Sequence, residues 1–256
     1  MSLLTVKNVS KAFDQNKIID NIDIELHEGE IVSLLGTSGG GKTTLFNIIA
    51  GISKPDTGSV YLNGEDITGR TGLVSYMLQK DMLLPYKTVL DNVSLPLVIK
   101  GVKKKEAREQ ARPYLKQFGL EGYEDKYPRA LSGGMRQRAA FLRTYLFSGR
   151  VAILDEPFSA LDMLTKTELH SWYMDIMKDI KLSTLFITHD IDEAIMLSDR
   201  IYILTGKPGT ITKEIVIEEG KYKPENFNLR EKFLKYKQQI VAALKQDNTD
   251  NDYKNV

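Results

Sequence analysis

A glycine-rich loop between an apolar run and a helical pattern constrains this chain more than any other feature. Ile31–Leu35 has the short, apolar character of a buried strand, and Leu45, Ile48 and Ile49 then recur at helical spacing. Strand, glycine loop and helix in this order predict an α/β fold with a phosphate-binding loop. The loop and first helical turn comprise Gly36, Thr37, Ser38, Gly39, Gly40, Gly41, Lys42, Thr43 and Thr44.

The residue types of this loop suit the phosphates of ATP. Glycines let the backbone approach an anion and aim its N–H groups at it, and the start of the helix adds its positive end. Lys42 is expected to reach the β- and γ-phosphates, and Thr43 to bind Mg²⁺. A chance glycine loop is the alternative, but the flanking strand and helix patterns disfavour it.

A second apolar run, Val151–Leu154, ends in two adjacent carboxylates. Such a run can simply mark a strand that meets a helix cap. With a phosphate loop upstream, the catalytic interpretation is favoured: Asp155 binds Mg²⁺ through water, and Glu156 positions the attacking water.

Leu131–Gln137 is a second glycine-containing helix start, in which Ser132, Gly133 and Gly134 offer a hydroxyl and main-chain N–H groups. A chain that binds one triphosphate in its own loop needs no second phosphate site. The two sites therefore indicate a dimer in which each site serves a different nucleotide.

With these elements in order, the chain closely resembles the ATP-binding cassette ATPases of ABC transporters, from Leu3 to about Ile217. The resemblance implies that Gln79 is the Q-loop glutamine near Mg²⁺, that Asp162 belongs to the nucleotide-binding D-loop, and that His189 is the switch histidine. Phe13 matches the adenine-stacking aromatic, although a strand-end core residue is an equal alternative. Met135 replaces a common glutamine and Gly149 a common proline of the family.

The implied fold is α/β: a P-loop NTPase core with an antiparallel β subdomain and an inserted α-helical subdomain. We expect an ATPase domain over residues 1–220 with the insertion at about 80–149, then a C-terminal helix and polar tail over 221–256. Pro113 is expected to kink or divide the helix over 103–118, and residues 246–256 to be frayed.

The resemblance also implies partners. They are a second copy of the chain or a paralogue, two transmembrane permease subunits and, indirectly, an extracytoplasmic solute-binding protein. Leu83–Val93, Pro157–Asp162 and Pro208–Ile211 are similar to nitrate, taurine and aliphatic-sulfonate importers, whose relatives serve thiamine-precursor uptake. ATP and Mg²⁺ are the expected cofactors, and the cytoplasmic face of the membrane is the expected location.

The composition argues against several other functions and kinds of site. The formal net charge of +1 gives no global attraction for nucleic acid, and the absence of cysteine excludes disulfides and thiolate metal sites. We expect no export signal at the N-terminus and no membrane span. A soluble cassette ATPase acting in nucleic-acid or translation processes is the alternative function. Such proteins usually carry long coiled-coil insertions or two cassettes in one chain, and this sequence shows neither. A P-loop kinase is disfavoured by Leu131–Gln137.

Overall fold

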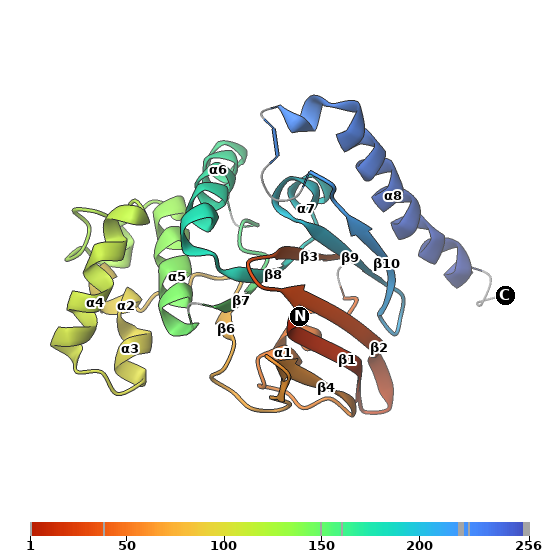
Figure 1. Ribbon diagram of the computed structural model, residues 1–256, viewed down its shortest axis with the longest axis horizontal. Coiled ribbons are helices and arrows are strands. Elements are labelled where there is room, and N and C mark those ends of the chain that lie inside the picture. Colours follow the sequence, from red (N-terminus) through yellow and green to blue (C-terminus); the bar gives the residue numbers. More distant parts are fainter. Residues whose placement is uncertain are drawn as a thin grey trace. The chain divides into compact units, whose positions relative to one another are not determined.

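The computed structural model describes residues 2–37, 39–148, 150–159, 161–219, 223–224 and 226–252, with side chains up to residue 245 (Figure 1). Two compact units divide the chain. The first unit combines residues 1–73 with 183–256, and the second comprises residues 74–182. Each unit carries its own part of the predicted site.

An antiparallel sheet opens the first unit. Its strands are β1 (Ser2–Phe13), β2 (Asn16–His27), β4 (Thr57–Leu62) and β5 (Glu65–Asp66), in the order β2-β1-β4-β5. Leu4 and Val6 of β1 are buried and alternate with more exposed residues, as the sequence pattern predicts. Asn63 and Gly64 both take positive φ between β4 and β5, which suits a tight hairpin turn.

The first unit also contains the strands that carry the glycine loop. They are β3 (Ile31–Gly36), β8 (Ser183–Thr188), β9 (Arg200–Thr205) and β10 (Thr210–Val216). β3 lies between β8 and β9 and is parallel to both, while β10 pairs with β9 in antiparallel fashion. Every residue of β3 and β8 is buried, as expected for strands covered on both faces.

The helices in the described part of this unit are α1 (Lys42–Ile49), α7 (Ile191–Leu197), the 3-10 helix η2 (Phe227–Leu229) and α8 (Glu231–Asp252). Phe233, Tyr236 and Ile240 of α8 are buried in one apolar cluster with residues of α7, β9 and β10. Figure 1 shows α8 in blue at the C-terminal end of the chain. The expectation that residues 246–256 are frayed is wrong up to Asp252, because α8 continues to that residue, and residues 253–256 lie outside the described residues. Each residue added to a formed helix gains a hydrogen bond, which favours this extension.

The second unit consists mainly of helices. Two short parallel strands, β6 (Ser75–Met77) and β7 (Val151–Asp155), pair with each other. The helices are α2 (Val89–Val93), α3 (Leu95–Ile99), α4 (Lys104–Gln117), η1 (Pro128–Ala130), α5 (Gly133–Ser148) and α6 (Met163–Ile180). Pro113 lies inside α4 without dividing it, so of the two outcomes expected for this proline the division is wrong, and the kink stays a prediction.

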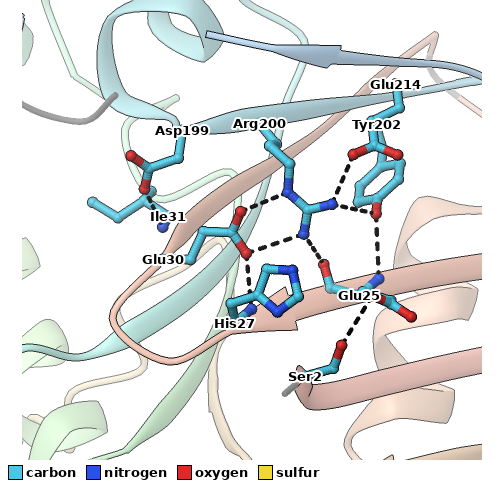
Figure 2. A network of polar contacts seen from close by, with 9 residues as sticks. All are labelled: Ser2, Glu25, His27, Glu30, Ile31, Asp199, Arg200, Tyr202 and Glu214. Atoms are coloured by element: carbon cyan, nitrogen blue, oxygen red, sulfur yellow. Dashed lines mark hydrogen bonds and ion pairs between the residues drawn. The ribbon is translucent and has the colours of Figure 1, made fainter. Parts of the chain in front are cut away.

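A polar network around Arg200 holds the strands of the first unit together (Figure 2). The guanidinium of Arg200 donates to both carboxylate oxygens of Glu30, at 2.5 and 3.0 Å, and to Glu214 at 2.7 Å. It also donates to the main-chain oxygen of Glu25 in β2, at 2.7 Å. Burial alone would lower the pKa of Arg200, but the hydrogen bonds that it donates to Glu30 and Glu214 raise this pKa. The antiparallel sheet is thus fastened to the strands that carry the glycine loop.

The predicted fold class is confirmed: the chain has an α/β core, an antiparallel β subdomain and a helical insertion. Over the described residues, no helix combines the length and apolar character needed to cross a membrane.

Candidate nucleotide site

The glycine loop follows β3 directly and ends where α1 begins, as the sequence predicts. Gly39 and Gly41 have φ of 80° and 89°, in the left-handed region that favours glycine. A Cβ atom at Gly39 would meet no atom within 4 Å, so this part of the loop faces open space. A Cβ at Gly41 would instead overlap the side chain of Ile19. The backbone is therefore open on one side and closely packed on the other. Ser38 lies outside the described residues.

Lys42 lies in the first turn of α1 and is only 7% exposed. Its Nζ donates hydrogen bonds to the main-chain oxygens of Gly36 and Thr37, at 2.9 and 2.8 Å. These two hydrogen bonds hold the ammonium group of Lys42 against the first residues of the loop. An anion in the loop would meet this charge and the positive end of α1 together.

Thr43 and Thr44 follow Lys42 in the first turn of α1, and Thr43 is exposed. Among the described residues, no group of three or more His, Asp or Glu side chains forms a metal site. Mg²⁺ usually takes one or two protein ligands together with substrate phosphates and waters. A threonine hydroxyl beside a phosphate loop fits that kind of site, and a dedicated protein cage is not required.

Phe13 ends β1 and is 49% exposed, with the Lys11 ammonium 5.3 Å from the centre of its ring. Of the two interpretations offered by the sequence, the core residue is wrong, because half of the ring is accessible. The role of this ring in stacking on adenine stays a prediction.

His189 is exposed immediately after β8, and the next residue, Asp190, caps α7 through the N–H groups of Asp192 and Glu193.

In the second unit, the structure brings Gln79 and Glu156 into contact. Gln79 follows β6 and Glu156 follows β7, and these parallel strands end at the same edge. Gln79 Nε2 donates to Glu156 Oε2 at 3.2 Å and to Ser159 Oγ at 3.3 Å. Glu156 has a φ of 44°, an unusual backbone conformation for a residue other than glycine and one often found at functional sites.

Asp155, the last residue of β7, is 9% exposed. The hydroxyl of Tyr76 in β6 donates to its Oδ2 at 3.5 Å. Burial raises the pKa of Tyr76, and the nearby charge of Asp155 raises it further, so the hydroxyl keeps its proton at neutral pH. Tyr76 is therefore a neutral donor that helps to orient the predicted Mg²⁺ ligand.

The second glycine motif opens α5, as predicted. Ser132 is exposed and its Oγ accepts the N–H of Met135 at 3.2 Å, which makes it an N-cap. A Cβ at Gly133 would come 3.2 Å from Leu161, and one at Gly134 would come 3.2 Å from Thr165. A side chain at either glycine would require Leu161 or Thr165 to shift by a few tenths of an ångström, so the start of α5 packs closely against the start of α6.

Asp162 caps α6, because its Oδ1 accepts the N–H of Thr165 at 3.1 Å. That hydrogen bond lowers the pKa of Asp162, which keeps it ionised at neutral pH. Its predicted contact with nucleotide remains a prediction beside this structural role.

Two arginines of α5 that the sequence did not single out bind the segment after Gln79. Arg143 donates to the main-chain oxygens of Asp81 at 2.5 Å and Met82 at 2.7 Å. Arg136 pairs with the carboxylate of Asp81 at 3.3 Å. The helix that carries the second glycine motif therefore holds the chain that carries Gln79. Arginines at helical spacing are too common for their sequence positions to have indicated this contact.

The loop, Phe13 and His189 belong to the first unit, whereas Gln79, Asp155, Glu156 and the second glycine motif belong to the second. A family model for ABC transporters matches residues 19–159. The formylaminopyrimidine import ATP-binding protein ThiZ of Halalkalibacterium halodurans is 47% identical over 207 residues, which cover 80% of this chain and 81% of that protein. The nitrate import ATP-binding protein NrtD of Synechocystis sp. is 37% identical over 238 residues, with coverage of 91% and 90%.

A solved structure agrees with these relatives. The dimeric, post-hydrolysis ATP-binding cassette MJ0796 bound to ADP and phosphate superimposes with a TM-score of 0.70 at 29% identity, covering 84% of this chain and 99% of that one. The relatives are import subunits, and none of them supports the alternative of an ATPase acting on nucleic acid or in translation. The chain therefore belongs to the ABC transporter family, as an ATP-binding ATPase subunit.

Proposed function

We propose that this chain powers an importer by binding ATP between two copies of itself, or between itself and a paralogue. The glycine loop with Lys42 holds the phosphates of one nucleotide, and Phe13 stacks on its adenine. Ser132, Gly133 and Gly134 of the second copy bind the γ-phosphate from the opposite side. Hydrolysis removes the group that joins the two copies, so the dimer opens.

Thr43, Gln79 and, through water, Asp155 would hold Mg²⁺ together with the phosphates. When bound, the metal would neutralise negative charge that develops on the phosphates. Glu156 positions the attacking water, and Gln79 holds Glu156 through the 3.2 Å hydrogen bond. His189 is assigned to the γ-phosphate side of the site, and Asp162 to the contact between the two copies.

The observation that best supports this assignment is the glycine loop itself. Its backbone is left-handed at Gly39 and Gly41, open on one side, and crossed by the buried ammonium of Lys42. These are the features that an ATP phosphate chain requires.

Replacement of Lys42 by alanine tests the loop. The Kd for MgATP should rise at least about tenfold, because a charge-assisted contact with phosphate is lost. Lys213→Ala is the matched control, since Lys213 is exposed on β10 of the same unit. Fluorescence titration with a labelled ATP analogue measures both. An unchanged affinity in a folded Lys42→Ala protein would contradict the assignment of the loop.

The transported solute belongs to the class handled by its relatives: formylaminopyrimidine, nitrate or an aliphatic sulfonate. Other subunits recognise it. In this proposal the chain lies on the cytoplasmic face of the membrane, under two permease subunits that receive solute from an extracytoplasmic binding protein. Leu78, Met82 and Tyr86 lie close to Gln79 in the sequence and are exposed, which suits contact with a permease. Purification of the chain from detergent-solubilised membranes tests this location. We expect a polytopic membrane protein to copurify, and isolation of the chain alone would count against the proposed permease partners.

A further inference from the structure

The segment Pro208-Gly209, between β9 and β10, has no role in the function described so far. It lies against the glycine loop, although the two are far apart in the sequence. A Cβ atom at Gly209 would overlap the carbonyl oxygen of Gly40, and the Gly40 carbonyl carbon lies 3.3 Å from that position. The oxygen is the nearer of the two atoms, so the Gly40 carbonyl points at Gly209.

Gly209 is fixed in place from the other side. Its N–H donates to the main-chain oxygen of Ile18 at 2.8 Å, and its carbonyl accepts the N–H of Asp20 at 2.9 Å. These two bonds on either side of Ile19 tie the segment to β2. Since the backbone of Gly209 is held by both of its polar groups, it cannot withdraw from the glycine loop without breaking them.

The same stretch of β2 contacts the next residue of the loop. The position of a Cβ at Gly41 lies 3.1 Å from Ile18 Cγ2 and 3.2 Å from the Ile18 oxygen, and it overlaps Ile19 Cγ2. Gly40 and Gly41 therefore lie against two supports, the Gly209 backbone and the β2 strand, which are themselves hydrogen-bonded to each other.

We infer that Ile18–Asp20 and Gly209 form a brace that fixes the Gly40–Gly41 peptide, and that Gly209 is a positioning residue for the nucleotide phosphates. In a trans peptide the carbonyl and the N–H point in opposite directions. Because the Gly40 carbonyl points at Gly209, the Gly41 N–H points away from it. A rotation of this peptide would turn away one of the N–H groups that the loop offers to phosphate. The inference rests on the proposed role of Gly36–Thr44 as the phosphate loop.

The brace also lies close in the sequence to the residue proposed to bind the adenine of the nucleotide. Phe13, at the end of β1, pairs with Asn16 at the start of β2, only two residues before Ile18. The β1–β2 hairpin therefore carries the adenine-stacking ring at the end of one strand and the segment that supports the phosphate loop near the start of the next.

Gly209→Ala is the direct test, because the φ of Gly209 lies outside the left-handed region and alanine can adopt it. The Kd values for MgATP and MgADP should each rise about tenfold, with a matching rise in KM, while kcat at saturating ATP stays within about twofold of wild type. Lys207→Ala, exposed in the same turn, is the control and should bind nucleotide normally.

If Gly209→Ala does not fold, Ile18→Ala supplies the second test. It removes a half-buried side chain beside Gly41 and keeps the main-chain hydrogen bonds of Ile18, so we expect affinity to fall about threefold. Lys42→Ala is measured in parallel. The brace alone is overturned if a folded Gly209→Ala protein binds nucleotide with normal affinity while Lys42→Ala binds it weakly. Where Ile18→Ala replaces Gly209→Ala, the same outcome applies to it. Normal affinity in Lys42→Ala overturns the phosphate loop as well.

Discussion

Arg200 shows how one side chain can hold several strands. Its side chain is 13% exposed and that of Glu30 is 11% exposed, and the two are joined by two hydrogen bonds. A lysine has the same charge but cannot span Glu30, Glu214 and the main-chain oxygen of Glu25 at once.

We predict that Arg200→Lys lowers the free energy of unfolding by about 3 kcal/mol, because it leaves the nearly buried Glu30 poorly paired. Arg70→Lys is the control. Arg70 pairs with Glu65 at the surface, where both side chains are more than half exposed, and its replacement should change stability by less than about 0.5 kcal/mol. Urea titrations followed by circular dichroism compare the two variants. Equal midpoints for both would show that the network of Figure 2 adds no stability.

At the scale of elements, helix α4 is fastened to α2 by one carboxylate. Asp91 of α2 pairs with Arg108 at 2.8 Å and with Lys104 at 3.3 Å, both on α4. The hydrogen bond from Arg108 lowers the pKa of Asp91, and Lys104 lowers it further. Three consecutive lysines, Lys103–Lys105, stand at the start of α4, and Lys104 among them has this intramolecular partner.

The sign of the pH dependence follows from that lowered pKa. Asp91 contributes stability above the pKa of an unfolded aspartate, about 3.9, and the contribution is lost as pH falls through the lower folded value. Asp91→Asn should therefore cost about 1 kcal/mol at pH 7, and the difference from wild type should shrink as pH falls below about 3.9. Glu109→Gln, on an exposed position of α4, is the control. Thermal unfolding at several pH values measures the difference, and a gap that stays constant down to pH 2 would contradict it.

Local sequence patterns predicted some elements and missed others for identifiable reasons. Apolar strands and glycine loops are local signals, so β3, β7 and α1 follow from the sequence. Helix α6 was not predicted, although Asp162 caps it and Leu169, Tyr173 and Ile176 form its buried stripe. That stripe is a recognisable helical spacing, and the cap before it was a signal that could have located the helix.

The candidate site shows a second limit. Local motifs predicted Lys42 and Glu156, and the family resemblance implied Gln79. The structure brings Gln79 and Glu156 within hydrogen-bond distance. The support from Gly209 and the contacts of Arg143 join segments distant in sequence. Such contacts depend on strand order and on close backbone approach, which no local pattern encodes.

At the scale of the whole molecule, the central claim is that ATP joins two copies of this chain and that Glu156 drives the step that separates them. Glu156→Gln retains the shape of the side chain and its ability to contact Gln79, but removes the negative charge that positions and polarises the attacking water. Nucleotide binding should therefore persist while hydrolysis stops.

The most direct test measures the mass of Glu156→Gln by light scattering after gel filtration, with and without ATP, alongside its rate of phosphate release. The account predicts a monomer without nucleotide, a stable dimer with ATP, and a kcat reduced at least about 100-fold. Lys42→Ala introduced into the same protein should abolish the dimer. A Glu156→Gln protein that stays monomeric at saturating ATP, or that hydrolyses ATP at the wild-type rate, would contradict the account.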